Sequence, residues 1–163
     1  MNPSLFKFIV LVASIFFIIL NLTIFTAELC YQRSIAAKEW GISFLKTMSY
    51  IDAAITLIPI NSEYYYQKYS LLNDKYKNAK WLSRSEKIAL LDEAIAALRL
   101  AIELEPSKAS YHMFYALTLI KKQYLVNDAH AAALVKDELR KACELKPFSK
   151  AYQEIYNKFI PRQ

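Results

Sequence analysis

Hydrophobic residues follow two different patterns along this chain. Residues 8–27, FIVLVASIFFIILNLTIFTA, contain no charged residue. From Glu28 to Ile58, apolar residues instead recur every three or four positions, which is the period of an amphipathic helix. Beyond Asn61, further stripes with this helical period are separated by turn residues. Together the patterns predict an all-α protein in which an apolar N-terminal helix precedes several amphipathic helices.

The apolar run is long enough to cross a membrane. A helix of its twenty residues spans about 30 Å, the thickness of the hydrocarbon core. A cleaved signal peptide is the alternative, because Lys7 precedes the run as a basic residue precedes a signal core. However, TIFTAEL places Phe25 where cleavage requires a small residue. We therefore expect residues 1–28 to be a retained transmembrane anchor that crosses the membrane at 8–27.

The charges that flank the run predict its orientation. Lys7 lies before it, and Arg33 and Lys38 follow it, so the two sides nearly balance. A short tail with one lysine favours a signal-anchor arrangement, in which the tail stays inside and the rest of the chain is exported. We expect a single-pass protein of a bacterial inner membrane with its C-terminal part on the periplasmic side.

Residues 29–60 are expected to form a stalk or first packing helix. No proline precedes Pro59 in this segment, and Gly41 is the only residue that favours a break. A helix that continues directly from the anchor would make a rigid stalk. Its apolar stripe, expected to face the following helices, consists of Trp40, Phe44, Leu45, Met48, Ile51, Ile55 and Ile58.

One motif occurs three times. AITLIPINSEY covers residues 54–64, AIELEPSKASY covers 101–111 and ACELKPFSKAY covers 142–152. Each copy has Ala, two residues, Leu, one residue, Pro, four residues and Tyr. Proline lacks the backbone N–H and clashes with the preceding turn, so it ends a helix. Each copy therefore predicts a helix–turn–helix junction, with its alanine at a close helix crossing and its tyrosine on the first turn of the next helix.

The motif resembles the end of the second helix in tetratricopeptide repeats, which commonly reads AIELDP. The resemblance covers roughly residues 45–160, and its most specific part is 101–106. The prolines lie 47 and 41 residues apart, whereas the family repeats every 34 residues, and Ala116 matches the small residue of the family's first helix. The resemblance implies an antiparallel helix-hairpin solenoid of about two to three degenerate repeats in residues 61–163, closed by a C-terminal capping helix.

Capping residues locate the helices of this region. Ser83 and Glu86 form a capping box, so one helix starts there and runs to Pro106. The others are expected from Asn61 or Ser62 to Lys80, from Lys108 to Tyr124, from Asn127 or Asp128 to Lys146, and from Ser149 to Ile160.

Composition and spacing argue against catalysis and bound cofactors. The chain has one glycine, whereas phosphate loops, dinucleotide turns and nucleophile elbows all need glycine. His112 and His130 have no neighbours at metal-ligand spacing, and Cys30 and Cys143 suggest neither a metal site nor a disulfide. The net charge of +6 comes from basic residues scattered among acidic ones, which disfavours a nucleic-acid surface. We expect no enzyme activity, metal, cofactor or nucleic acid.

Contact with a protein is the activity that the sequence favours. The helix at 108–124 is apolar nearly all round, and two flanking helices would cover only two of its sides. The stalk, a second copy of the chain or a partner would cover the third. In the family, the first helix of each repeat lines the concave face, which implies the groove residues Tyr66, Gln67, Ser70, Met113, Leu117, Lys121, Glu154 and Lys158. The competing interpretation is that these side chains pack in the core.

Two functions fit these patterns. The first is a membrane-anchored adaptor that binds a protein in its groove, within envelope assembly or a secretion apparatus. The second is a structural subunit of a larger membrane complex or of a homo-oligomer. Some tetratricopeptide repeats hold an acidic peptide terminus with a set of Lys and Asn residues. That set is missing here, so the resemblance disfavours this class of ligand.

Overall fold

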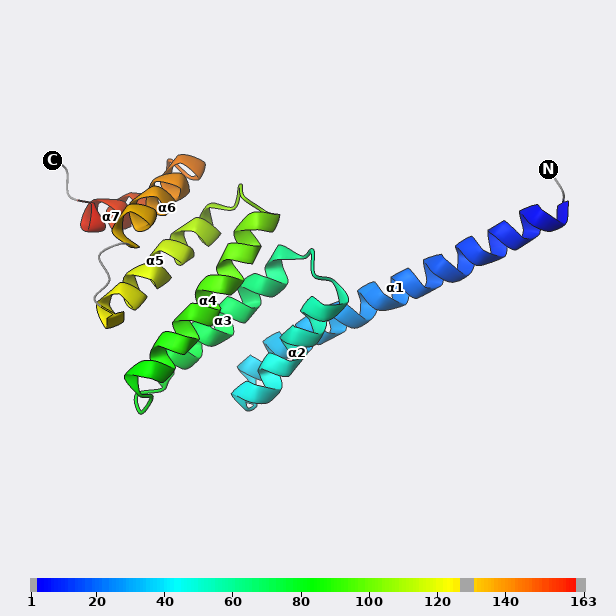
Figure 1. Ribbon diagram of the computed structural model, residues 1–163, viewed down its shortest axis with the longest axis horizontal. Coiled ribbons are helices and arrows are strands. Elements are labelled where there is room, and N and C mark those ends of the chain that lie inside the picture. The colour runs from blue at the N-terminus through cyan, green and yellow to red at the C-terminus, as the bar shows by residue number, and fades with distance from the viewer. Residues whose placement is uncertain (1–2, 127–130, 161–163) are drawn as a thin grey trace. The chain divides into compact units, whose positions relative to one another are not determined.

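A computed structural model describes residues 3–126 and 131–160 of the chain, with side chains from Lys7 onward. Within these residues, the secondary structure consists of seven α-helices (Figure 1). The chain divides into two compact units, Met1–Ile60 (unit 1) and Asn61–Gln163 (unit 2), and each is described by itself. The predicted all-α class is confirmed.

Unit 1 is a helical hairpin. Its first helix, α1 (Pro3–Glu39), carries the whole apolar run and continues without interruption beyond residue 28. The chain turns at Gly41, which has a left-handed φ of 68°. The N–H of Gly41 donates to the Lys38 carbonyl and that of Ile42 to the Ala37 carbonyl, which is the Schellman pattern of a helix C-terminus. The second helix, α2 (Phe44–Leu57), packs back along α1 (Figure 1).

The reversal at Gly41 changes the expected stripe of residues 40–58. Met48 and Ile51 are buried, as the spacing predicts, but Trp40 and Leu45 are 78% and 79% exposed. Residues 29–60 contain two helices and not one, so Trp40 does not share the register of α2. The expectation that Trp40 and Leu45 belong to the buried stripe is therefore wrong.

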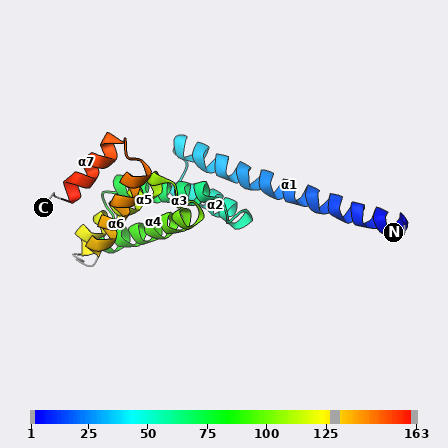
Figure 2. The same ribbon diagram turned by 90° about the horizontal axis from the view of Figure 1, so that it is seen from above.

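Unit 2 has two layers of helices. Its elements are α3 (Ser62–Asn78), α4 (Arg84–Leu104), α5 (Ala109–Val126), α6 (Ala131–Leu145) and α7 (Lys150–Phe159). Consecutive helices pack against each other, with α3 and α5 in one layer and α4 and α6 in the other (Figure 2). Asn61 caps α3, and Ser83 and Glu86 form the predicted capping box of α4. The expected cap at Asn127 or Asp128 lies outside the described residues.

The three copies of the motif share one geometry. Ala54, Ala101 and Ala142 are all 0% exposed. Each of their carbonyls accepts a hydrogen bond from the backbone N–H four residues later, at 3.0, 3.0 and 3.1 Å, and the proline follows directly. The N–H of each motif tyrosine donates to the carbonyl three residues earlier, at 3.2, 2.9 and 3.1 Å, in the first turn of the next helix. The prediction of one repeated helix–turn–helix junction is confirmed.

The helix α5 lies at the centre of the unit 2 core. Its apolar residues pack with those of α6 in a cluster of Met113, Ala116, Leu119, Ile120, Val135, Leu139 and Ala142. The closing helix α7 packs on this cluster through Tyr152, Ile155, Tyr156 and Phe159. Aromatic rings of α3 also contact α5, at Tyr111 and Phe114. The third side of this apolar helix is therefore largely covered from within unit 2 itself.

His112 of α5 makes a buried polar contact with α6. Its Nδ1 lies 2.5 Å from Oε2 of Glu138, and its Nε2 lies 2.8 Å from the Pro106 carbonyl oxygen. Because a carbonyl oxygen only accepts hydrogen bonds, Nε2 carries a proton and donates it. Lys141 also donates to Glu138, at 2.9 Å. Both imidazole nitrogens thus have partners, and the pair ties α5 to α6 inside the core.

Replacing Ala101 by leucine is expected to destabilise the protein by about 1–3 kcal/mol, because a larger side chain enters a fully buried crossing. Ala96→Leu on the same helix is the matched control, since Ala96 is exposed and its change should stay within about 0.5 kcal/mol. Urea unfolding of the detergent-solubilised chain, followed by circular dichroism, measures both variants. Equal midpoints would contradict a close crossing at Ala101.

Replacing Glu138 by leucine is expected to cost about 1–3 kcal/mol, because a buried imidazole nitrogen of His112 would lose its partner. Glu144→Leu is the control on the same helix. Glu144 is exposed and pairs with Arg140 at the surface, where solvent screens an ion pair and its contribution to stability is small. The same unfolding assay compares the two, and a Glu138 variant as stable as the Glu144 variant would show that the buried pair does not stabilise the core.

Candidate protein-binding surfaces

Aromatic side chains of α3 and α5 meet on one face of unit 2, here named the α3–α5 face. Tyr66 and Tyr69 come from α3, and Tyr111 and Phe114 come from α5. Their ring centroids lie 5.4–5.8 Å apart, and Tyr66 stacks on Tyr111. Such pairs contribute about 0.5–1.5 kcal/mol beyond the area that they bury. The rings of Tyr66 and Phe114 are only half-buried, so this aromatic cluster also forms part of the surface.

Charged groups close one end of this face. Nζ of Lys108 donates to the Glu63 carboxylate, which also accepts from the Tyr111 hydroxyl at 3.1 Å. Ser62 donates to Glu105 at 2.7 Å. The hydrogen bond from Lys108 to Glu63 raises the pKa of Lys108, while burial raises that of Tyr111. Each of these charges has a partner, so this network fixes the ends of α3 and α5.

Lys121 of α5 lies toward the other end of the face and differs from the lysines around it. Its Nζ donates to Oδ1 of Asn73 at 2.7 Å. Within the described residues it forms no ion pair, whereas Lys122, its neighbour in sequence, reaches Asp92 at 2.6 Å. Burial, followed by the nearby charge of Lys77, lowers the pKa of Lys121. A half-buried cation with a neutral partner is a place where an added carboxylate would be favourable.

The structure brings together only some of the residues predicted for the groove. Tyr66 lies in the aromatic cluster, and Lys121 lies on the same face. Leu117 is half-buried against the core cluster. Met113 is 2% exposed, so the expectation that it lines an accessible surface is wrong. Its side chain packs between α5 and α6. The alignment of Ala116 with the small residue of the repeat family did not predict this position.

The remaining predicted residues belong to two helices, α3 and α7. Gln67 is half-buried, and its amide nitrogen has no hydrogen-bond partner among the described residues. Ser70 is also half-buried. Glu154 and Lys158 are exposed on α7, while the residues through which α7 packs lie on its other side. The last helix therefore packs through its apolar side, and the predicted groove residues Glu154 and Lys158 lie on its exposed side.

The sequence interpretation missed three residues near the α3–α5 face: Asn73, Tyr111 and Tyr152. Asn73 is seven residues beyond Tyr66, which places it on the same side of α3. Tyr111 and Tyr152 end two copies of the repeated motif, and Tyr111 stacks on Tyr66. Burial raises the pKa of Tyr66, and the nearby Glu63 and Tyr152 raise it further. Helical spacing and the repeated motif could therefore have identified all three residues.

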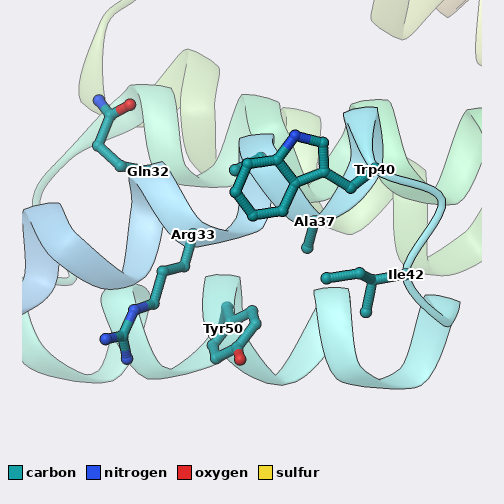
Figure 3. Close-up of a pocket in the computed structure, with 7 residues that line it drawn as sticks. Gln32, Arg33, Ala37, Trp40, Ile42 and Tyr50 are labelled. Carbon is teal, nitrogen blue, oxygen red and sulfur yellow. The ribbon is translucent and has the colours of Figure 1, made fainter.

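Unit 1 has a surface of its own, a cleft of about 400 Å³ between α1 and α2. Figure 3 shows Arg33 of α1, Trp40 in the turn that follows α1, and Tyr50 of α2 around this opening. Ala37 and Ile42, the two residues joined by the Schellman hydrogen bond, also line it. The turn at Gly41 thus builds a mixed aromatic and cationic cleft, which the single-helix interpretation did not predict.

Metal-ligating side chains are dispersed in the part of the chain that the structure describes. Within residues 3–126 and 131–160, no three His, Cys, Asp or Glu side chains gather as metal ligands would. His130 lies outside these residues. Cys30 and Cys143 are free thiols, and burial raises the pKa of Cys143.

Comparison with known proteins identifies the fold. No family model and no curated protein matches the chain. Among solved structures, the chain is similar to the tetratricopeptide repeat domain of Arabidopsis OM64, with a TM-score of 0.63 and 13% identity over 86% of this chain and 99% of that domain. It is also similar to the first tetratricopeptide repeat domain of Spaghetti (RPAP3), bound to the HSP90 peptide SRMEEVD, with a TM-score of 0.60 and 13% identity over 83% of this chain and 91% of that one. The chain therefore has a tetratricopeptide-repeat-like fold.

Proposed function

We propose that this protein is a membrane-anchored adaptor that binds a segment of a partner protein on the α3–α5 face. The observation that carries the proposal is Lys121, a half-buried cation that contacts the neutral amide of Asn73 and the ring of Tyr76 but no carboxylate within the described residues. The half-buried rings of Tyr66 and Phe114 lie about two helical turns away along the same face, seven residues before Asn73 and Lys121 respectively. Aromatic side chains around a desolvated charge are typical of the residues that dominate binding energy at interfaces.

The chemistry of this face favours a segment that carries a carboxylate. A carboxylate at Lys121 would form a charge-assisted hydrogen bond, which is stronger than the bond to a neutral amide. The Spaghetti domain is bound to SRMEEVD, a peptide with acidic residues, and this supports the same class of ligand. The sequence disfavours that class because the full Lys and Asn set is missing, but Lys121 and Asn73 supply one such pair in contact.

The anchor is the second part of the proposal. Of the helices described, α1 alone is long and apolar enough to cross a membrane. The most apolar stretch of α1 contains no buried residue. Phe16 and Phe25 are each 67% exposed, which is unfavourable in water and favourable in lipid. We propose that residues 8–27 remain attached and hold unit 2 on the periplasmic side of a bacterial inner membrane, where an adaptor would serve envelope assembly or secretion.

A structural subunit is the second candidate function. Trp40 and Leu45 expose large apolar surfaces at the turn of unit 1, close to the 400 Å³ cleft. Exposed apolar surface of this kind marks sites of protein contact. A subunit would purify with fixed stoichiometry in its complex, whereas an adaptor would also be found free of its partner.

The anchor is tested by extraction and by N-terminal analysis of the mature protein. We expect the intact chain to resist alkaline carbonate, to dissolve in detergent and to begin near Met1, because an apolar helix is stable in lipid. A mature chain that begins near Glu28 would show a cleaved signal peptide and would rule out the anchor.

Binding at the α3–α5 face is tested by photo-crosslinking in cells. A photoreactive amino acid at Leu117 is expected to give one discrete adduct, because Leu117 lies between the aromatic cluster and Lys121 along α5. Lys121→Glu should abolish the adduct, because it places a negative charge where the partner's carboxylate would lie.

Lys122→Glu is the matched control for the adduct at Leu117. It makes the same change of charge one residue away, at the contact with α4, so the adduct should persist. Circular dichroism should show unchanged helix content in both variants. An adduct that survives Lys121→Glu, or that also disappears with Lys122→Glu, would contradict binding at this face.

A further inference from the structure

The apolar segment of α1 carries polar side chains on two opposite sides. Ser14 and Asn21 are seven residues apart, so they lie within about 20° of each other around the helix. Thr23 follows Asn21 by two residues, which is about 200° around a helix of 3.6 residues per turn. Thr26 lies on the side of Thr23. Asn21 and Thr23 therefore face opposite directions.

The hydroxyl groups of this segment are satisfied within the helix. Ser14 donates to the Val10 carbonyl at 2.8 Å, and Thr23 donates to the Ile19 carbonyl at 3.0 Å. Thr26 donates to Leu22 in the same way, at 2.7 Å. A hydroxyl group has a single hydrogen to donate, so these three side chains have no unused donor.

Asn21 is different because its amide has more hydrogen-bonding groups than the helix can satisfy. Its Nδ2 donates one hydrogen to the Phe17 carbonyl at 2.7 Å. The second hydrogen of Nδ2 and the oxygen Oδ1 have no partner within the described residues. In hydrocarbon no water can satisfy them, so each unpaired group is costly.

The side of α1 that carries Asn21 lies away from the residues of α1 that unit 1 buries. The buried residues of the second half of α1 are Ala27, Ser34 and Ala37, which lie 120–160° away from Asn21 at about 100° per residue. Glu28, one heptad beyond Asn21, is exposed and accepts a hydrogen bond from Gln32 at 2.7 Å. A second helix can therefore approach Asn21 without meeting α2.

We propose that α1 pairs in the membrane with α1 of a second copy of this chain, through reciprocal hydrogen bonds between the two Asn21 amides. The inference rests on the membrane anchor of the proposed function. A carboxamide both donates and accepts, so it is complementary to itself. Two copies inserted in the same orientation place Asn21 at the same depth, whereas another protein would need a polar group at that depth.

The surroundings of Asn21 fit a contact between two copies. Residues 8–27 contain no charge that would need an opposite charge on a different partner. Ser14 is small and lies one heptad earlier on the same side, so it lets the backbones approach. Glu28 would meet its own copy one heptad later, and the repulsion ends the contact where the apolar run ends.

The pairing is tested with full-length chain labelled with donor or acceptor dyes and reconstituted in phosphatidylcholine vesicles. Energy transfer is measured as the protein-to-lipid ratio is varied. Asn21→Leu removes both reciprocal hydrogen bonds and is expected to lower the association constant by about 10- to 1000-fold, which is about 3- to 30-fold for each interhelical bond. Asn21→Gln keeps the amide and should stay within about twofold of the original chain. Thr23→Val is the matched control on the opposite side and should leave the association constant unchanged.

The outcomes separate this inference from the anchor on which it rests. If carbonate releases the chain, or if its mature N-terminus lies near Glu28, the anchor itself fails. If the chain stays in the membrane but Asn21→Leu associates as strongly as the original, pairing through Asn21 is overturned and the anchor stands. A loss with Thr23→Val equal to that with Asn21→Leu, or no energy transfer at any density, overturns the pairing as well.

Discussion

The ends of the helices at Pro59, Pro106 and Pro147 are the constraint on which the stack of helices depends. A proline inside a helix costs about 3 kcal/mol, so each helix end is held at one residue. An end displaced by one residue would turn the following apolar stripe by about 100° and move it off the core. The alanine five residues before each proline is fully buried, and its small side chain permits a close approach of neighbouring helices. The prolines thus fix the register, and the alanines make that register compatible with packing.

The same junctions also determine the α3–α5 face. Each motif ends in a tyrosine on the first turn of the next helix, and two of them, Tyr111 and Tyr152, lie near Tyr66. Pairs that join α3 to α5 are separated by 45 residues for Glu63 and Lys108 and by 48 for Asn73 and Lys121. These separations are close to the 47 residues between the first two prolines. Equivalent positions of successive repeats therefore meet, and the repeat length sets the chemistry of the surface.

The dependence of these contacts on the repeat length explains which parts of the structure could be predicted from the sequence. Caps, helix ends and the all-α class depend on neighbouring residues, and Ser83 with Glu86 formed the predicted capping box. The reversal at Gly41 was visible only as a weak point, because a glycine permits a left-handed turn without requiring it. Met113 was misplaced because the family register was applied to a chain whose repeats are longer. An offset of one repeat length from Tyr66 and Asn73 would have indicated the contacts with α5, including Lys121.

Three polar side chains in apolar surroundings distinguish structural from functional roles in this chain. Both nitrogens of His112 have partners, so the residue is explained by the core alone. Within the described residues, Lys121 contacts the neutral amide of Asn73 and the ring of Tyr76 but no carboxylate, and the amide of Asn21 is only partly satisfied. A leucine at either position would avoid the free-energy cost of an incompletely paired polar group, and it would preserve the helix. Stability of the isolated chain therefore favours an apolar residue at both places. The polar groups are accounted for when a second molecule completes their bonds: a carboxylate for Lys121, and a like amide for Asn21.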